Sequence, residues 1–185
     1  MHLSQATALI PIDVQQGFDL IKAKRNNPTM EENGRHLLSV WRQRASRIMH
    51  VQHKSVNPQG LFHPAHSGYD FRAGFAPLPG ELLINKSVNS AFIGTDLDLQ
   101  LRRARVDTVV LFGMTTDMCV STTARHASNL GYKTIVISDA CACFAVKDKQ
   151  GEISAEDVHR IHLATLAEEF ATVVTTDTSL KSLAN

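Results

Sequence analysis

The sequence has no apolar run approaching the roughly 20 residues that a membrane-spanning helix needs. Its start, MHLSQAT, is polar and lacks the basic and then apolar profile of a secretory signal. No long block of one charge occurs, and the 19 basic and 18 acidic residues nearly balance. Neither a nucleic acid nor an anionic membrane is therefore expected as a partner. These absences predict a soluble, cytoplasmic protein.

Cysteine is scarce as well. Cys119, Cys141 and Cys143 form no CxxC pair of the kind that indicates a redox or zinc motif, and an odd count leaves at least one thiol free. Cys141 and Cys143 are interpreted as small residues packed near a strand end, with a second reactive site as the alternative. No GxGxxG follows the first apolar run, which argues against a dinucleotide-binding domain.

What the sequence does contain is a regular alternation of short apolar runs and helical patterns. Its length and 43% hydrophobic content suit one domain over residues 1–185. Runs rich in Val and Ile predict strands at Ala8 to Val14, Ile48 to His53, Leu82 to Lys86, Thr108 to Gly113, Thr134 to Ser138 and Thr172 to Thr175. Apolar residues three and four apart predict helices at Met30 to Arg47, Asp96 to Arg105, Asp117 to Leu130 and Ser154 to Phe170. The order predicts a three-layer α/β/α fold with a mostly parallel six-stranded sheet and helices on both faces.

Local signals support the helix ends and mark one misfit. Ser154 and Asp157 resemble a capping box, and Gly131 suits a left-handed helix C-cap. Pro11 cannot donate to a sheet ladder, so the first strand is expected to be irregular there.

Ligands of parallel α/β sheets bind beyond the carboxyl ends of the strands. The residues at those predicted ends are Asp13, His53, Lys86, the turn at 113–119 and Asp139. The connection from Lys54 to Gly80 is long for a compact domain, which is typical of a lid or a pocket wall.

Three of these residues suggest nucleophilic chemistry. Asp13 and Lys86 each end an apolar strand at the same predicted edge, where pairing would satisfy both charges. Cys119 falls in the first turn of a predicted helix, where the helix dipole and Lys86 are expected to lower the thiol pKa and Asp13 could act as general base. The alternatives are a turn cap for Asp13, a solvated strand end for Lys86 and a packing role for Cys119.

The extended context around these residues resembles a known family. The segments IDVQQGF, NKSVNSAFIGTDLD and VVLFGMTTDMCVSTTARHASNLGYKTIVISDA are similar to the isochorismatase-like cysteine hydrolase superfamily, which includes nicotinamidases and N-carbamoylsarcosine amidases. Together with the order of strands and helices, the resemblance extends from Ala6 to Val174. It implies that Asp13, Lys86 and Cys119 form a catalytic triad that hydrolyses an amide, carbamoyl or ureido C–N bond through a thioester.

The resemblance also implies a cis peptide bond between Met114 and Thr115. The backbone N–H groups of Thr115 and Cys119 would then form an oxyanion hole. Two other functions are compatible with the sequence: a vinyl-ether hydrolase of the isochorismatase type, and a non-catalytic thiol-bearing domain that binds a ligand or senses redox state.

Metal is not expected, and no other cofactor is implied. Nicotinamidases of this superfamily bind a divalent ion through an Asp-x-His motif and a later His, but here Val51 precedes Gln52 and His53, so the Asp is missing. His53 is instead interpreted as a pocket residue. Whether His63 and His66 bind an ion is left open.

The resemblance further indicates which regions contact a small amide-type substrate. The expected substrate-binding residues are Phe18, His53, Asn89, Phe92 and Phe144. Relatives of this fold commonly assemble as dimers or tetramers, so a homo-oligomer is expected. The residues do not indicate which substrate is bound.

Overall fold

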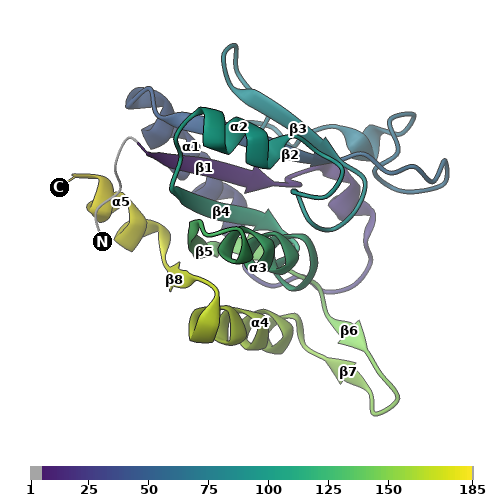
Figure 1. Ribbon diagram of the computed structural model, residues 1–185. Helices are drawn as coiled ribbons and strands as arrows, with labels where there is room; N and C mark the ends of the chain where they lie inside the picture. Colours follow the sequence, from purple (N-terminus) through teal and green to yellow (C-terminus); the bar gives the residue numbers. More distant parts are fainter. Residues whose placement is uncertain (1–5, 185) are drawn as a thin grey trace.

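The computed structural model describes residues 6–184 and has a six-stranded parallel sheet at its centre (Figure 1). The strands are β1 (Thr7–Ile12), β2 (Arg47–His53), β3 (Leu82–Lys86), β4 (Thr108–Met114), β5 (Lys133–Ala142) and β8 (Thr172–Val174). Their order in the sheet is β3-β2-β1-β4-β5-β8, and every neighbouring pair is parallel. The predicted fold class is confirmed. The order reverses between β1 and β4, where such sheets bind their ligands.

Helices cover both faces of this sheet. The α-helices are α1 (Met30–Gln43), α2 (Leu97–Arg103), α3 (Ser121–Asn129), α4 (Ala155–Glu169) and α5 (Thr176–Ala184). On one face, α1 packs against the central strands and against α5. On the other face, α3 packs against β5 and α4. In the view of Figure 1, α2 and α3 lie in front of the sheet and α1 lies behind it. No helix within residues 6–184 is long and apolar enough to cross a membrane.

Smaller elements complete the chain. Single short helical turns occupy Gln16–Leu20 and Ser67–Tyr69, and Thr116–Val120 forms a π-helical turn directly before α3. The strands β6 (Val146–Lys147) and β7 (Glu152–Ile153) form a hairpin that projects from the body in Figure 1. These turns, the hairpin and α5 were not predicted, because each is too short or too weakly periodic to stand out from the sequence.

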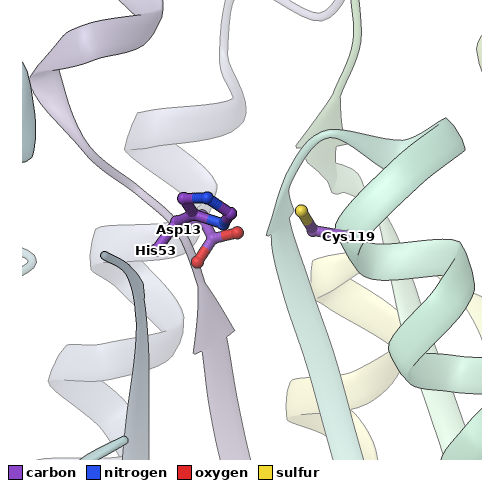
Figure 2. A group of neighbouring side chains, drawn as sticks. All are labelled: Asp13, His53 and Cys119. Atoms are coloured by element: carbon purple, nitrogen blue, oxygen red, sulfur yellow. The ribbon is translucent and has the colours of Figure 1, made fainter. Parts of the chain in front are cut away.

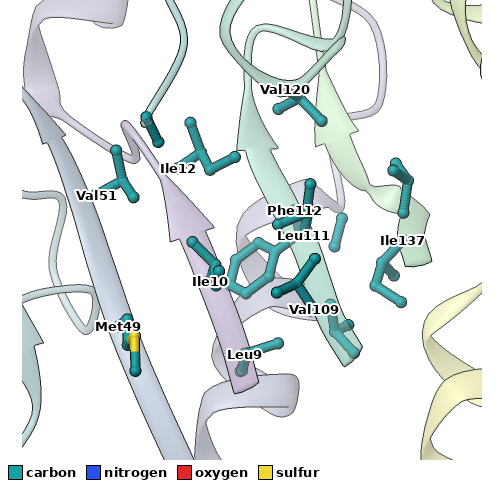
Figure 3. Packing of buried hydrophobic residues seen from close by; sticks show 14 of the residues in the cluster. Leu9, Ile10, Ile12, Met49, Val51, Val109, Leu111, Phe112, Val120 and Ile137 are labelled. Carbon is teal, nitrogen blue, oxygen red and sulfur yellow. The ribbon is translucent and has the colours of Figure 1, made fainter. Parts of the chain in front are cut away.

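The core lies along the two central strands. Every residue of β1 and β4 is buried, as expected for strands covered on both faces. Figure 3 shows Leu9, Ile10 and Ile12 of β1 beside Leu111 and Phe112 of β4. Burial of this kind contributes about 25 cal/mol per Å² of apolar surface. The two strands whose ends carry the candidate site are thus the most firmly packed part of the sheet.

Three local predictions can be compared with the structure. The Ser154 side chain accepts a hydrogen bond from the Asp157 N–H, and Gly131 has a φ of 91°, so both helix-end signals are confirmed. The pairing of β1 with β4 continues through Pro11 without a change of register. The residues of β1 that pair with β2 are Ala8, Leu9 and Ile12. The irregularity is thus limited to the β2 side of the strand.

Two predicted boundaries were wrong. The helix expected to reach Arg47 ends at Gln43, because Arg47 already begins β2. Strand β5 continues through Asp139 to Ala142, with a register shift against β4 between Leu111 and Gly113. Asp139 therefore lies within a strand, and its Oδ1 accepts hydrogen bonds from the N–H and hydroxyl of Thr176 at the start of α5.

A charged network fastens α1 to the end of the long connection. Glu81 accepts hydrogen bonds from Arg42 Nε at 2.7 Å and Nη2 at 2.9 Å, and its Oε2 lies 2.7 Å from Nε2 of the fully buried His50. Burial opposes ionisation of Glu81, but its hydrogen bonds with Arg42, Leu78 and His50 prevail and lower its pKa to about 2. The carboxylate thus stabilises the fold above the ordinary pKa of 4.5, and this contribution is lost as the pH falls toward 2.

We expect Glu81→Gln to lower the free energy of unfolding by about 1–3 kcal/mol at neutral pH, because the buried His50 and the partly buried Arg42 lose a charged acceptor. The deficit relative to wild type should shrink as the pH falls from 4.5 toward 2. Urea unfolding at a series of pH values measures it, with exposed Glu168→Gln as the control. A deficit that does not change with pH would contradict the assigned role.

Candidate active site

A cavity of about 370 Å³ opens at the carboxyl ends of the central strands. Its lining comprises Asp13, Phe18, Ile21, Ala23, His53, Phe62, Asn89, Thr115, Asp117, Met118, Cys119, Phe144, Ala145 and Val146. Four of the five expected substrate-binding residues are therefore at this cavity. The exception is Phe92, which does not line it and whose ring packs against His126 and Tyr132. Phe92 is therefore not part of the candidate site.

The turn after β4 places the thiol at the cavity. The Met114–Thr115 peptide bond is cis, at the position given by the family resemblance. The π-helical turn Thr116–Val120 follows, so Cys119 stands at the beginning of the helical segment that continues as α3. The Cys119 side chain is buried at the cavity wall, with 9% of the residue exposed. This turn, and not a regular α-helical first turn as predicted, directs the sulfur toward the end of β1.

The carboxylate is held by an unusual backbone conformation. Asp13 directly follows β1 with a φ of 51°, a left-handed geometry that Asp tolerates better than most residues. Its N–H donates to the carbonyl of Val51 on β2, which fixes the residue beyond the strand end. The side chain is buried and points toward His53 and Cys119 (Figure 2).

Lys86 contacts both the Asp13 carboxylate and the Cys119 thiol. Its Nζ forms an ion pair with Asp13 Oδ2 at 2.6 Å and donates to Cys119 Sγ at 3.2 Å. It also donates to Nδ1 of His53 at 3.1 Å. Lys86 ends β3, two strands away from β1, so parallel pairing through β2 brings the two charges to one edge. The predicted juxtaposition of Asp13, Lys86 and Cys119 is present.

The thiol is not the lowered-pKa group that the sequence predicted. Burial and the neighbouring Asp13 carboxylate outweigh Lys86 and raise the pKa of Cys119 to about 12. Burial also raises the pKa of Asp13, against the opposing effect of Lys86. The resting sulfur is therefore a thiol, and its ionisation requires a base beside it. A carboxylate with a raised pKa is a better proton acceptor than an ordinary one.

His53 is neutral and firmly oriented. Burial, followed by the charge of Lys86, lowers its pKa. Its backbone is held by the side chain of Gln15, whose Oε1 accepts from the His53 N–H and whose Nε2 donates to the His53 carbonyl. The same Gln15 amide donates to the carbonyl of Tyr69, which ties the long connection to the site. Gln15 is fully buried and supports both the end of β2 and the cavity wall.

Sequence reasoning missed further contributors. Phe62 lies in the long connection and forms a wall of the cavity, with its ring centroid 4.7 Å from that of Phe18. His159 on α4 is buried and pairs through Nδ1 with the Thr116 hydroxyl at 2.8 Å, which braces the turn that carries Cys119. The expectation that the connection is a pocket wall pointed to the segment but not to this phenylalanine. The sequence suggested that His159 faces a helix or a subunit contact, but not that it contacts the turn that carries Cys119.

The other two cysteines are structural. Cys141 and Cys143 are both buried and free, and burial raises the pKa of each to about 12. The Cys143 thiol donates to the carbonyl of Ala155 at the start of α4. The packing interpretation is confirmed for both residues.

The arrangement does not suit a metal ion. Asp13, His53 and Cys119 have donor atoms within 4.8 Å of one another, but the ammonium of Lys86 contacts all three and would repel a cation. His66 Nε2 lies 2.7 Å from the carbonyl of Pro58, and His63 Nδ1 accepts from the Ala65 N–H, so both histidines serve the fold of their loop. A nicotinamidase-type metal set is not formed by these residues.

The ion pair of Lys86 with Asp13 leads to a prediction about stability. We expect Lys86→Met to lower the free energy of unfolding by about 3–5 kcal/mol at neutral pH, because it leaves a buried carboxylate unpaired. The Asp13 pKa, already raised, rises further in the variant. The folded state then keeps a proton that the unfolded state releases above the ordinary value of 3.8.

The extra destabilisation of Lys86→Met is therefore smallest below pH 3.8. It grows as the pH rises from the folded-state pKa of Asp13 in wild type toward the higher folded-state pKa of Asp13 in the variant. Thermal unfolding of wild type, Lys86→Met and the surface control Lys133→Met across this range measures it. A Tm difference that is the same at every pH would show that Lys86 does not act on Asp13.

The protein-family model described as "Isochorismatase domain" matches residues 7–178. The chain belongs to the isochorismatase family. The isochorismatase-family protein YrdC of Bacillus subtilis is 44% identical over 177 residues, covering 95% of each chain. A solved isochorismatase-family structure from Chromobacterium violaceum has 36% identity and a TM-score of 0.96, covering 100% of this chain and 97% of that one.

Two further proteins that resemble this chain carry informative names. A structure described as a cysteine hydrolase, from Pseudomonas syringae, has 28% identity and a TM-score of 0.90, covering 98% of this chain and 94% of that one. Maleamate amidohydrolase of Pseudomonas putida is 32% identical over 113 residues, which cover 61% of this chain and 48% of the relative. Membership of the family shows that this protein is a hydrolase.

Proposed function

We propose that this protein is a cysteine-dependent hydrolase that cleaves a C–N bond of a small amide, carbamoyl or ureido compound. The observation that carries the proposal is the contact of one buried ammonium, Lys86, with both a buried carboxylate and a cavity-lining thiol. A base, a nucleophile and a cation that serves both are the groups that acyl transfer through sulfur requires. The names of the P. syringae and P. putida relatives support the same chemistry.

In the first half of the reaction, Asp13 takes the proton of the Cys119 thiol as the sulfur attacks the carbonyl carbon. The oxygen gains the negative charge, which the N–H groups of Thr115 and Cys119 are proposed to stabilise, each by about 2.7–4 kcal/mol. Protonated Asp13 then gives its proton to the leaving nitrogen. The C–N bond breaks, ammonia or an amine departs, and the acyl group remains on sulfur as a thioester.

In the second half, Asp13 accepts a proton from water as that water attacks the thioester carbon. Collapse of the adduct breaks the C–S bond and releases the acid, and the proton returns to sulfur. Lys86 holds Asp13 in place throughout and stabilises the sulfur while it carries negative charge.

The experiment measures ammonia released from a panel of primary amides, carbamoyl compounds and ureas by wild type and by Cys119→Ala, with a chelator present. We expect release that depends on Cys119 and does not change with the chelator. Vinyl ethers are assayed alongside by the carbonyl product that their hydrolysis releases, and turnover of these in place of amides would support the isochorismatase-type reaction instead. Absence of turnover on every class would favour a binding or sensing role.

A further inference from the structure

A buried histidine outside the cavity is hydrogen-bonded to the turn that carries Cys119. His159 lies on α4, and its Nδ1 is 2.8 Å from the hydroxyl of Thr116. His159 is 7% exposed and Thr116 is fully buried. Thr116 directly follows Thr115, whose N–H is one of the two proposed oxyanion donors. The contact therefore joins the backbone that would hold the oxyanion to a helix of the protein body.

The histidine ring is neutral and connects three elements. Burial lowers the pKa of His159, against the opposing effects of the Glu156 charge and of a hydrogen bond with the backbone of Ser138 on β5. At neutral pH the ring therefore pairs with the Thr116 hydroxyl as an uncharged partner. One side chain of α4 thus contacts both the turn and the neighbouring strand β5.

The turn has few other side-chain anchors. The Thr115 carbonyl accepts from the N–H groups of Met118 at 3.2 Å and Val120 at 3.1 Å, but these bonds lie within the turn and do not fix its position against the sheet. Apart from the contacts of Cys119 itself, the bond from Thr116 to His159 is the one side-chain hydrogen bond that links residues 115–120 to another element in the described part of the chain.

Building on the proposed function, we propose that His159 is a positioning residue, whose hydrogen bond with Thr116 holds the N–H of Thr115 at the oxyanion. His159 does not line the cavity, so it acts through Thr116 and not on the substrate. Its effect falls on the step in which the carbonyl oxygen becomes negative. The sulfur and its neighbours Asp13 and Lys86 are not altered by its loss.

The test compares amide turnover with a reaction of the same sulfur that forms no oxyanion. Methylation of Cys119 by methyl iodide, followed by peptide mass spectrometry, reports the reactivity of the thiol alone. A displacement of about 1 Å at a reaction centre can lower rates by about 10²-fold. We expect His159→Phe to lower kcat for the best amide by about 10–100-fold, with KM and the methylation rate within about threefold of wild type.

Two further variants distinguish a lost hydrogen bond from a lost ring. The amide of His159→Asn can pair with Thr116 at the position of Nδ1, so this variant should recover most of kcat. Loss of an imidazole from the exposed position His36 on α1, in His36→Phe, should leave every rate at the wild-type value.

Thr116→Val removes the hydroxyl at nearly constant shape and keeps the test decisive if His159→Phe does not fold. It should show the same pattern, and the double variant should lose no more kcat than either single variant, because both changes delete one bond. A kcat that stays at the wild-type value, a methylation rate that falls in parallel with kcat, or equal losses in His159→Phe and His159→Asn would overturn the inference.

Reversible addition of benzaldehyde to Cys119 separates this inference from the proposed function. The sulfur bonds to the aldehyde carbon, the thiol proton passes to the oxygen, and no group leaves. We expect the dissociation constant of this adduct, measured by protection from methylation, to rise about 10-fold in His159→Phe and in Thr116→Val, the order of one hydrogen bond. An unchanged constant, or no adduct with wild type, would refute the positioning role even if amides are hydrolysed. The expected rise without any amide hydrolysis would refute the proposed function alone.

Discussion

Replacement of Cys119 by alanine is expected to lower the turnover of the best amide substrate by about 10⁴-fold or more, as loss of the nucleophile does in enzymes whose catalytic residues act as a unit. Cys119 Sγ is the atom at the cavity wall that contacts Lys86, and the other two thiols lie outside the cavity. Steady-state release of ammonia by wild type and variant measures the loss.

Cys141→Ala is the matched control for the loss of a thiol. Cys141 is fully buried in β5 and takes no part in the proposed reaction, so its variant should keep activity within a few-fold of wild type. Circular dichroism and Tm show whether both variants fold. If Cys119→Ala retained a tenth of the wild-type rate, the sulfur could not be the nucleophile.

The second large effect is expected for Asp13→Asn. The amide has the shape of the carboxylate but cannot accept the thiol proton, and loss of a general base lowers rates by about 10²–10⁴-fold. The loss should be greater than usual here, because burial raises the pKa of Cys119 to about 12 and the sulfur has little thiolate of its own at neutral pH. For the same reason, the residual activity of Asp13→Asn should rise with pH through the alkaline range.

The pH–rate profiles of wild type, Asp13→Asn and the exposed control Asp177→Asn provide the measurement. The control should follow the wild-type profile. A variant rate close to wild type, with the same pH dependence, would remove Asp13 from the mechanism.

The architecture of the site could be predicted from the sequence because strand ends are strongly marked. Asp13 and Lys86 each terminate an apolar run, and the rule that parallel strands end at one edge places them together. The family resemblance placed Cys119 and the cis bond. The resemblance also indicated the substrate-binding regions, and four of the five expected residues line the cavity because each ends or follows a strand that ends there.

Other features depend on three-dimensional packing that local patterns do not encode. Burial decides the sign of the Cys119 pKa shift, and the degree of burial appears only when α3, β1 and β4 are assembled. Phe92 lies outside the cavity because its ring packs against His126 and Tyr132. Gln15 looks like an ordinary polar residue in sequence, yet it is the clamp that holds His53 and Tyr69.

The central claim is that an acyl group is carried by Cys119, and a partition experiment tests it most directly. Hydroxylamine competes with water for a thioester and yields a hydroxamate that is readily quantified. An amide and a methyl ester of the same acid form the same acyl-enzyme, so this account predicts the same ratio of hydroxamate to acid from both. Different ratios, or ammonia release from the amide with no hydroxamate at any hydroxylamine concentration, would contradict it.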